Sequence, residues 1–105
     1  MSQKVNILYI GRHAEITTVV TRLLNNNEDW LGICTTTDAE AKELFLQHEF
    51  DIVLLGNGIT KDEDHQLREY FTNHNPVIKI VQHYGGGSGL LKSEILMALN
   101  KKADL

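Results

Sequence analysis

The sequence predicts an α/β fold, a three-layer sandwich in which helices cover both faces of a four-stranded parallel sheet. Strand and helix patterns alternate four times along the 105 residues, and strands separated by helices join through right-handed crossovers into a parallel sheet. The segment 50–56 is an apolar run with Asp51 near its start, and a Gly-Asn-Gly turn ends it. Such a run is typical of a strand buried on both faces, in the middle of a parallel sheet.

The first half of the chain predicts two strand–helix units. A strand over 5–10 precedes the turn 11–13, and a helix follows in which apolar residues recur at i, i+3, i+4, i+7 and i+8. These are Ile16, Val19, Val20, Leu23 and Leu24. Segment 30–35 is the second strand. A capping-box pattern from Thr37 to Glu40 begins a second helix, which extends to about residue 49 and presents Ala41, Leu44, Phe45 and His48 on one side.

The second half predicts a strand over 50–56, a helix that begins at a second capping box and stops before Pro76, and a strand over 77–81. A glycine-rich connector over 85–89 then leads into a last helix over about 90–102. Right-handed crossovers give the strand order 2-1-3-4, with the first helix on one face and the second and third on the other. The last helix is expected beside the first, and the whole chain 1–105 forms one domain.

Composition predicts a cytoplasmic globular protein and argues against two classes of partner. The 42% hydrophobic and 23% charged residues are usual for a folded domain. A net charge of −4, with no basic cluster beyond Lys101 and Lys102, argues against nucleic acid and anionic membranes. The run 5–10 is too short for a signal peptide or a membrane span. Cys34 lies in an apolar segment, so we expect a buried structural thiol in a reducing compartment.

Ligands of open parallel sheets bind beyond the carboxyl ends of the strands. At that edge the turns offer Arg12, His13 and His83, and these residues with Gly86 and Gly87 of the glycine-rich connector form a candidate anion-binding set. The connector lacks the Lys-Ser/Thr ending of a phosphate-binding loop. A flexible connector is therefore the competing interpretation of these glycines.

The sequence predicts neither a metal site nor a catalytic group. The edge carries no carboxylate before 62–64 (Asp-Glu-Asp), and acidic residues in the first turn of a helix are favoured by the helix dipole alone. His48, His65 and His74 lack the spacing of metal ligands. Ser88 and Ser93 have no nucleophile-elbow pattern around them. We expect no cofactor.

The chain resembles the receiver domains of two-component response regulators, which have a flavodoxin-like fold. The resemblance extends over about the first 84 residues and is carried by the strand 4–10, the helix that begins at 13–16, and the segments 50–55 and 75–81. It implies a role in signal transduction. One helix–strand unit near the C-terminus of a full receiver is missing from this chain.

The residues of the receiver active site are replaced. Receivers hold Mg²⁺ with an acidic pair after the first strand, where this chain has Gly11 and Arg12, and they phosphorylate an aspartate where it has Gly56. Receivers end the fourth strand with a Thr or Ser, and this chain has Val81 at that position. Mg²⁺ prefers oxygen ligands and phosphoryl transfer to a receiver needs a carboxylate. We therefore predict no phosphorylation and no enzymatic activity.

Two functions remain open. The first is a protein-interaction module in signal transduction whose protein partner does not depend on phosphate. The alternative is a small flavodoxin-like protein that binds an anion or nucleotide at the carboxyl edge of the strands.

The fourth strand predicts a further interaction. Without a fifth strand it lies at the edge of the sheet, and it is apolar except for one lysine; its residues are Val77, Ile78, Lys79, Ile80 and Val81. Open edges need charge, proline, a bulge or a cover. Either the glycine-rich connector and last helix fold over this edge, or a second copy pairs with it in a two-fold homodimer. We favour the homodimer, because the glycine-rich connector covers little apolar surface.

Overall fold

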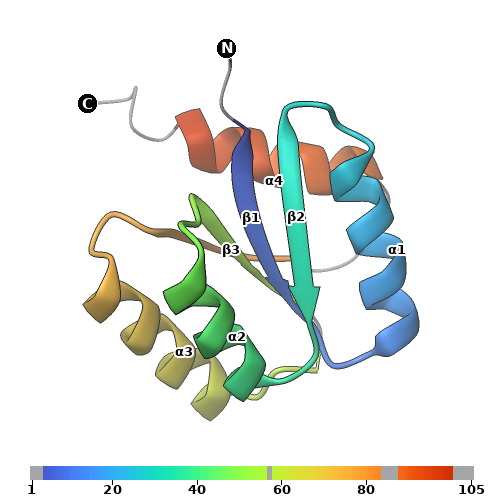
Figure 1. Ribbon diagram of the computed structural model, residues 1–105. Helices are drawn as coiled ribbons and strands as arrows, with labels where there is room; N and C mark the ends of the chain where they lie inside the picture. Colours follow the sequence, from blue (N-terminus) through green and yellow to red (C-terminus); the bar gives the residue numbers. More distant parts are fainter. Residues whose placement is uncertain (1–3, 57, 84–87, 101–105) are drawn as a thin grey trace.

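The computed structural model describes residues 4–56, 58–83 and 88–100, and these form a three-layer α/β sandwich (Figure 1). All neighbouring strands are parallel, in the order β2-β1-β3-β4. The strands are β1 (Val5–Ile10), β2 (Trp30–Thr35), β3 (Ile52–Leu55) and β4 (Lys79–Gln82). The predicted fold class and strand order are confirmed.

In the described part of the chain, four helices cover the sheet, two on each face. They are α1 (Ala14–Asn25), α2 (Asp38–Gln47), α3 (Lys61–His74) and α4 (Ser88–Asn100). Figure 1 shows α2 and α3 together in front of the sheet and α4 behind it. One core joins α1 and α4 to the sheet through Val20, Leu24, Leu91 and Ile95. The other joins α2 and α3 through Ala41, Phe45, Leu67 and Phe71. The predicted distribution of the helices is confirmed.

The central strand β3 is buried on both faces, as its unbroken apolar run predicts. Its four residues have no exposed surface. Successive side chains of a strand point to opposite faces, so Ile52 and Leu54 belong to the α1/α4 core while Val53 and Leu55 belong to the α2/α3 core. Burial of side chains of this size contributes about 1.5–3 kcal/mol each, so β3 stabilises both cores.

Only one of the two predicted capping boxes forms completely. At α3 the Thr60 hydroxyl accepts from the Glu63 amide at 3.2 Å, and the Glu63 carboxylate accepts from the Thr60 amide at 3.0 Å. At α2 the Thr37 hydroxyl accepts from the Glu40 amide at 3.2 Å. The carboxylate of Glu40 instead accepts from the Thr35 hydroxyl, because that hydroxyl lies within its reach at the end of β2.

Strand β4 begins two residues later than predicted. Asn75 accepts from the Ile78 amide through its backbone oxygen at 3.0 Å, and from the Val77 amide through its side-chain oxygen at 3.2 Å. These two hydrogen bonds hold the amides of Val77 and Ile78 in a turn that precedes the strand. Val77 therefore lies outside β4 with 71% of its surface exposed, and the strand continues to Gln82 instead of stopping at Val81.

Other predicted bounds also move. Strand β3 is shorter than 50–56, α2 ends at Gln47 so that His48 is an exposed cap residue, and α4 begins at Ser88 inside the predicted connector. Ile16 and Val19 are 42% and 43% exposed, and the buried residues of α1 are Thr17, Val20 and Leu24 instead. Residues 84–87, which contain the other glycines of the connector, lie outside the described residues. No helix in the described part of the chain is long and apolar enough to cross a membrane.

Candidate functional site

The strand order reverses direction between β1 and β3, which makes their carboxyl ends the expected place for a ligand. The chain leaves β1 toward β2 on one side, and leaves β3 toward β4 on the other. Gly11 follows β1 and Gly56 follows β3. The Gly56 amide donates to Ile10 O at 2.7 Å, and the Gly11 amide donates to Thr35 O at 3.1 Å. The two glycines thus continue the backbone hydrogen bonds of the sheet just beyond β1 and β3, where open parallel sheets bind their ligands.

The side chain of Tyr9 fills this crevice on the α1/α4 face. A Cβ atom at Gly11 would lie 2.7 Å from Tyr9 Cε2, and a Cβ atom at Gly56 would lie 2.6 Å from Tyr9 Cζ. Real Cβ atoms do not approach other atoms so closely. The ring is 1% exposed, and its burial, with a contribution from Cys34, raises the pKa of the phenol. Glycine at both positions is therefore required by the neighbouring tyrosine ring.

Arg12 lies at the same edge, where two helices supply its partners. Its Nη2 is 2.7 Å from Asp38 Oδ1 at the start of α2 and 3.2 Å from Glu63 Oε1 at the start of α3. Its Nη1 donates to Thr36 O at 3.0 Å. Burial alone disfavours the charged guanidinium, but the hydrogen bonds to Asp38 and Glu63 outweigh that cost and raise the pKa of Arg12. The arginine is held by two carboxylates and does not offer a free positive charge.

Gly58 makes room for this ion cluster. It has φ of +90°, a conformation that glycine adopts readily. A Cβ atom there would lie 2.8 Å from Arg12 Cβ. The turn after β3 can therefore pass closely over Arg12 and present α3, with Glu63, to the guanidinium.

His83 lies on the opposite face of the sheet from Arg12. It is 3% exposed, its Nδ1 lies 2.5 Å from Glu94 Oε1 on α4, and its ring meets the Tyr9 ring edge-on with centroids 6.3 Å apart. Its amide donates to Leu55 O at 2.8 Å. Tyr9 belongs to the α1/α4 core, so His83, whose ring contacts that of Tyr9, faces this layer. Arg12 binds carboxylates at the starts of α2 and α3 and faces the other layer.

The structure does not assemble the predicted anion-binding set. Arg12 is paired with carboxylates and His83 is buried against Glu94. His13 is an exposed residue that precedes α1 without capping it through its side chain. Gly86 and Gly87 lie outside the described residues. The interaction of Arg12 with Asp38 was missed by the sequence analysis, although both residues follow strands that pair side by side.

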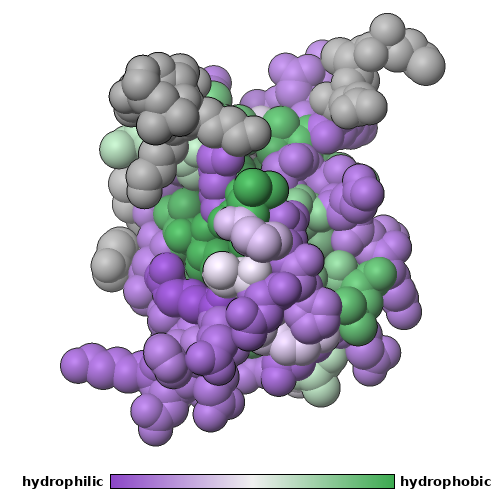
Figure 2. Space-filling view, turned by 90° about the vertical axis from the view of Figure 1, so that its left-hand side faces the viewer, coloured by the Kyte–Doolittle hydropathy of each residue, from purple (hydrophilic) through white to green (hydrophobic). Residues whose placement is uncertain are grey.

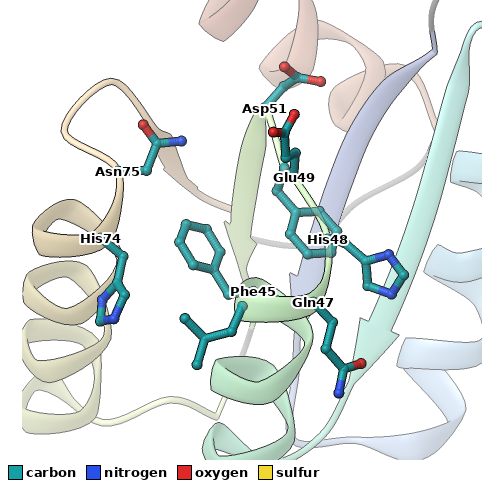
Figure 3. A pocket seen from close by; sticks show the side chains of 9 residues that line it. Phe45, Gln47, His48, Glu49, Asp51, His74 and Asn75 are labelled. Carbon is teal, nitrogen blue, oxygen red and sulfur yellow. The ribbon is translucent and has the colours of Figure 1, made fainter.

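A cleft of about 520 Å³ lies at the other end of the sheet, between the C-terminal ends of α2 and α3. Figure 3 shows His74 and Asn75 on one side of it and Phe45 and His48 on the other. A second cleft of about 490 Å³ lies beside the carboxyl end of β4, lined by Ile59, Thr60, Lys61, Asp64, Arg68 and Gln82. In the latter, Arg68 is already bonded to Asp64 at 2.6 Å. Among the described residues no group of three His, Cys, Asp or Glu side chains is placed to hold a metal ion.

Comparison with known proteins supports the fold alone. No protein-family model and no curated protein sequence matches the chain. The lactose-specific IIB component domain of the phosphoenolpyruvate:carbohydrate phosphotransferase system from Streptococcus pneumoniae has a similar structure, with a TM-score of 0.64 and 11% identity over 97% of both chains. A putative pilus assembly-related protein from Burkholderia pseudomallei is similar over 93% of this chain and 75% of its own, with a TM-score of 0.57 and 16% identity. The chain therefore shares a flavodoxin-like α/β fold with these proteins.

Proposed function

We propose that this chain is a protein-interaction module of receiver-like form, which acts in signalling without accepting a phosphoryl group at the junction of β1 and β3. The position of the Tyr9 ring over Gly11 and Gly56 carries this proposal. An acceptor side chain at either glycine would need the space that the ring occupies. The site is therefore built as packed core on that face of the sheet.

The electrostatics of the junction support the same proposal. Stabilising a transferring phosphoryl group requires positive charge that is free to approach its oxygens. Arg12 is within hydrogen-bonding distance of both Asp38 and Glu63, so its cluster carries one positive and two negative charges. An approaching phosphate would meet a net negative group and would have to displace a carboxylate.

The alternative of an anion- or nucleotide-binding protein is weakened by the same contacts. Arg12, the arginine of the predicted anion-binding set, is already bound by two carboxylates, and His83 faces the other layer against Glu94. The IIB component domain belongs to a phosphotransferase system by its name, so phosphorylation on another residue is the competing outcome. His13 is exposed at the carboxyl edge of the strands and is the residue on which such phosphorylation would be sought.

The experiment is phosphorylation by acetyl phosphate with Mg²⁺, followed by intact-mass measurement at neutral pH. A receiver domain with its full active site, in the same tube, is the positive control. We expect a phosphoryl group on the control and none on this chain. An adduct on Asp51, Asp62 or His13 would contradict the proposal. In a parallel thermal-shift assay with nucleotides and phosphorylated metabolites, a rise of the melting temperature would favour the anion-binding alternative.

A further inference from the structure

The two edges of the sheet are finished differently. Alternate residues of a parallel strand direct both their N–H and C=O groups to the same side. In β2 the odd-numbered residues face β1, because Val5 N donates to Asp29 O and Gly11 N donates to Thr35 O. Gly32 therefore directs its N–H and C=O groups away from the sheet, toward the outer side of β2.

The outer side of β2 is capped at Gly32 by the chain itself. The Asn25 side chain accepts from Gly32 N at 2.9 Å and donates to Gly32 O at 3.1 Å, so its amide takes the place of a neighbouring strand. The Trp30 amide donates to Asn27 O at 3.1 Å. Such blunting prevents another chain from pairing with an edge strand.

The outer side of β4 has no such partner among the described residues. Lys79 N donates to Asp51 O at 3.4 Å and His83 N donates to Leu55 O at 2.8 Å, so the odd-numbered residues face β3. The N–H and C=O groups of Ile80 and Gln82, and the C=O group of Ile78, therefore point outward. No hydrogen bond within the described part of the chain uses these groups.

Strand β4 and the two residues before it carry mostly apolar side chains. The side chains of Ile78 and Ile80 are partly buried against the α2/α3 core and that of Val81 against the α1/α4 core. Val77, beside the strand, is 71% exposed. Figure 2 shows hydrophobic side chains gathered near the centre of the side on which β4 ends the sheet. Lys79 is the one charged residue of the strand, which is weak protection for an edge.

We propose that the occupant of this edge is a second copy of the chain, paired antiparallel with β4 about a two-fold axis at Ile80. In antiparallel pairs, residues whose groups point toward the partner oppose each other and exchange both hydrogen bonds. Ile80 then opposes the partner's Ile80, and Gln82 opposes the partner's Ile78. The result is one continuous eight-stranded sheet with an isologous interface.

The two-fold axis repeats each hydrogen bond of this register. Ile80 N–H donates to the partner's Ile80 O, and Gln82 N–H donates to the partner's Ile78 O, each twice. Ile78 N–H is not needed, since it already donates to Asn75 O. The register therefore uses every outward group of the edge except Gln82 C=O, because the amide opposite it, Ile78 N–H, stays bound to Asn75 O. It requires no change in the turn before β4.

Neighbouring registers are less favourable. An axis at Lys79 would place two lysines directly opposite each other, and like charges in that arrangement destabilise a pair. An axis at Val81 would oppose Lys79 to the buried His83. The axis at Ile80 instead opposes Lys79 to Val81 and brings two isoleucines into contact on the α2/α3 face.

A second copy of the chain is thus a partner of the proposed interaction module. The dimer rests on the proposed function only for its role in signalling. The two can fail separately, because phosphorylation is read by mass and self-association by light scattering. Light scattering after size exclusion is expected to give twice the 11.9 kDa mass of one chain. Ile80→Pro removes an N–H that faces away from β3, so it should yield a folded monomer. A monomer of the unmodified chain at high micromolar concentration would overturn the inference.

Cysteine cross-linking tests the register without relying on a proline variant. In a Cys34→Ala background, Ile80→Cys places two cysteines across the axis, about 5.5 Å apart between Cα atoms, which suits a disulfide. Lys79→Cys is the matched control, because two residues of offset separate its copies by roughly 8 Å. We expect oxidation to give a covalent dimer of the Ile80→Cys protein alone. Cross-linking through Lys79→Cys, or a dimer that neither variant cross-links, would refute the pairing.

Discussion

The ring of Tyr9 lies so close over Gly56 that a Cβ atom at residue 56 would come within 2.6 Å of Tyr9 Cζ. The same ring approaches Gly11, which follows β1 on the same face of the sheet. A single side chain from inside β1 thus determines what residues can follow both central strands. The junction where an open parallel sheet would receive a ligand is closed on this face by the core itself.

We predict that Gly56→Ala destabilises the protein by about 1–3 kcal/mol, because it forces an overpacked contact with Tyr9. In a Tyr9→Leu background the same change should cost much less, since the ring is gone. Urea unfolding of the four proteins in this double-mutant cycle measures the coupling. An equal loss of unfolding free energy in both backgrounds would show that Gly56 is required for a reason other than the Tyr9 ring.

Glu63 gives the protein an acid-sensitive component of stability. The hydrogen bond from the Thr60 amide, and after it the interaction with Arg12, lower the pKa of Glu63 from its usual 4.5. A carboxylate with a lowered pKa in the folded state contributes stability above its unfolded pKa, and this contribution is lost as pH falls below about 4.5. We expect Glu63→Gln to flatten the fall of unfolding free energy between about pH 5 and pH 3. Glu69→Gln, an exposed change on the same helix, should leave that slope unchanged.

Asn25 is expected to protect the β2 edge. Asn25→Ala removes both hydrogen bonds to Gly32, and we predict a loss of about 1 kcal/mol in unfolding free energy. The Gly32 amide should exchange its hydrogen faster in this variant. Asn26→Ala is the matched control, because its side chain is exposed and makes no hydrogen bond within the described residues. Unchanged exchange at Gly32 would show that the Asn25 amide is not the cap.

The contact between His83 and Glu94 is expected to fasten α4 to the end of β4. Glu94→Ala leaves the buried imidazole without this partner, and we predict a loss of about 1–3 kcal/mol. Ser93→Ala, an exposed change one residue away, should have little effect. Thermal and urea unfolding compare the two variants. A stable Glu94→Ala protein would mean that the apolar contacts of α4, such as those of Leu91 and Ile95, hold the helix without this bond.

Cys34 is expected to react slowly as a nucleophile. Burial raises the pKa of its thiol, although a hydrogen bond with Thr21 acts in the opposite direction. The reactive thiolate is therefore scarce at neutral pH. We predict that iodoacetamide modifies Cys34 in the native protein on the order of tenfold more slowly than in urea. Equal rates in the two states would indicate an accessible, activated cysteine.

The predicted strands that matched best are those whose pattern is set locally. Strands β1 and β2 have the bounds expected from their apolar runs. Strand β4 did not, because the oxygens of Asn75 compete for the amides of Val77 and Ile78. In α1 the apolar residues form a wider stripe than the sheet can bury, so Ile16 and Val19 remain half exposed. Periodicity indicates which side of a helix faces the core, but the width of the contact depends on its neighbours.

The alternation of strands and helices and the strand order could be predicted from the sequence, since they follow from local pattern and from the handedness of crossovers. The lack of a carboxylate at Gly11 and Gly56 could be read from it directly. The position of the Tyr9 ring above those glycines and the binding of Arg12 by two carboxylates appear only in the three-dimensional structure. The ion cluster needs Arg12, Asp38 and Glu63 from three separate turns within hydrogen-bonding distance. Such distances depend on how the helices pack on the sheet, and sequence spacing does not encode them.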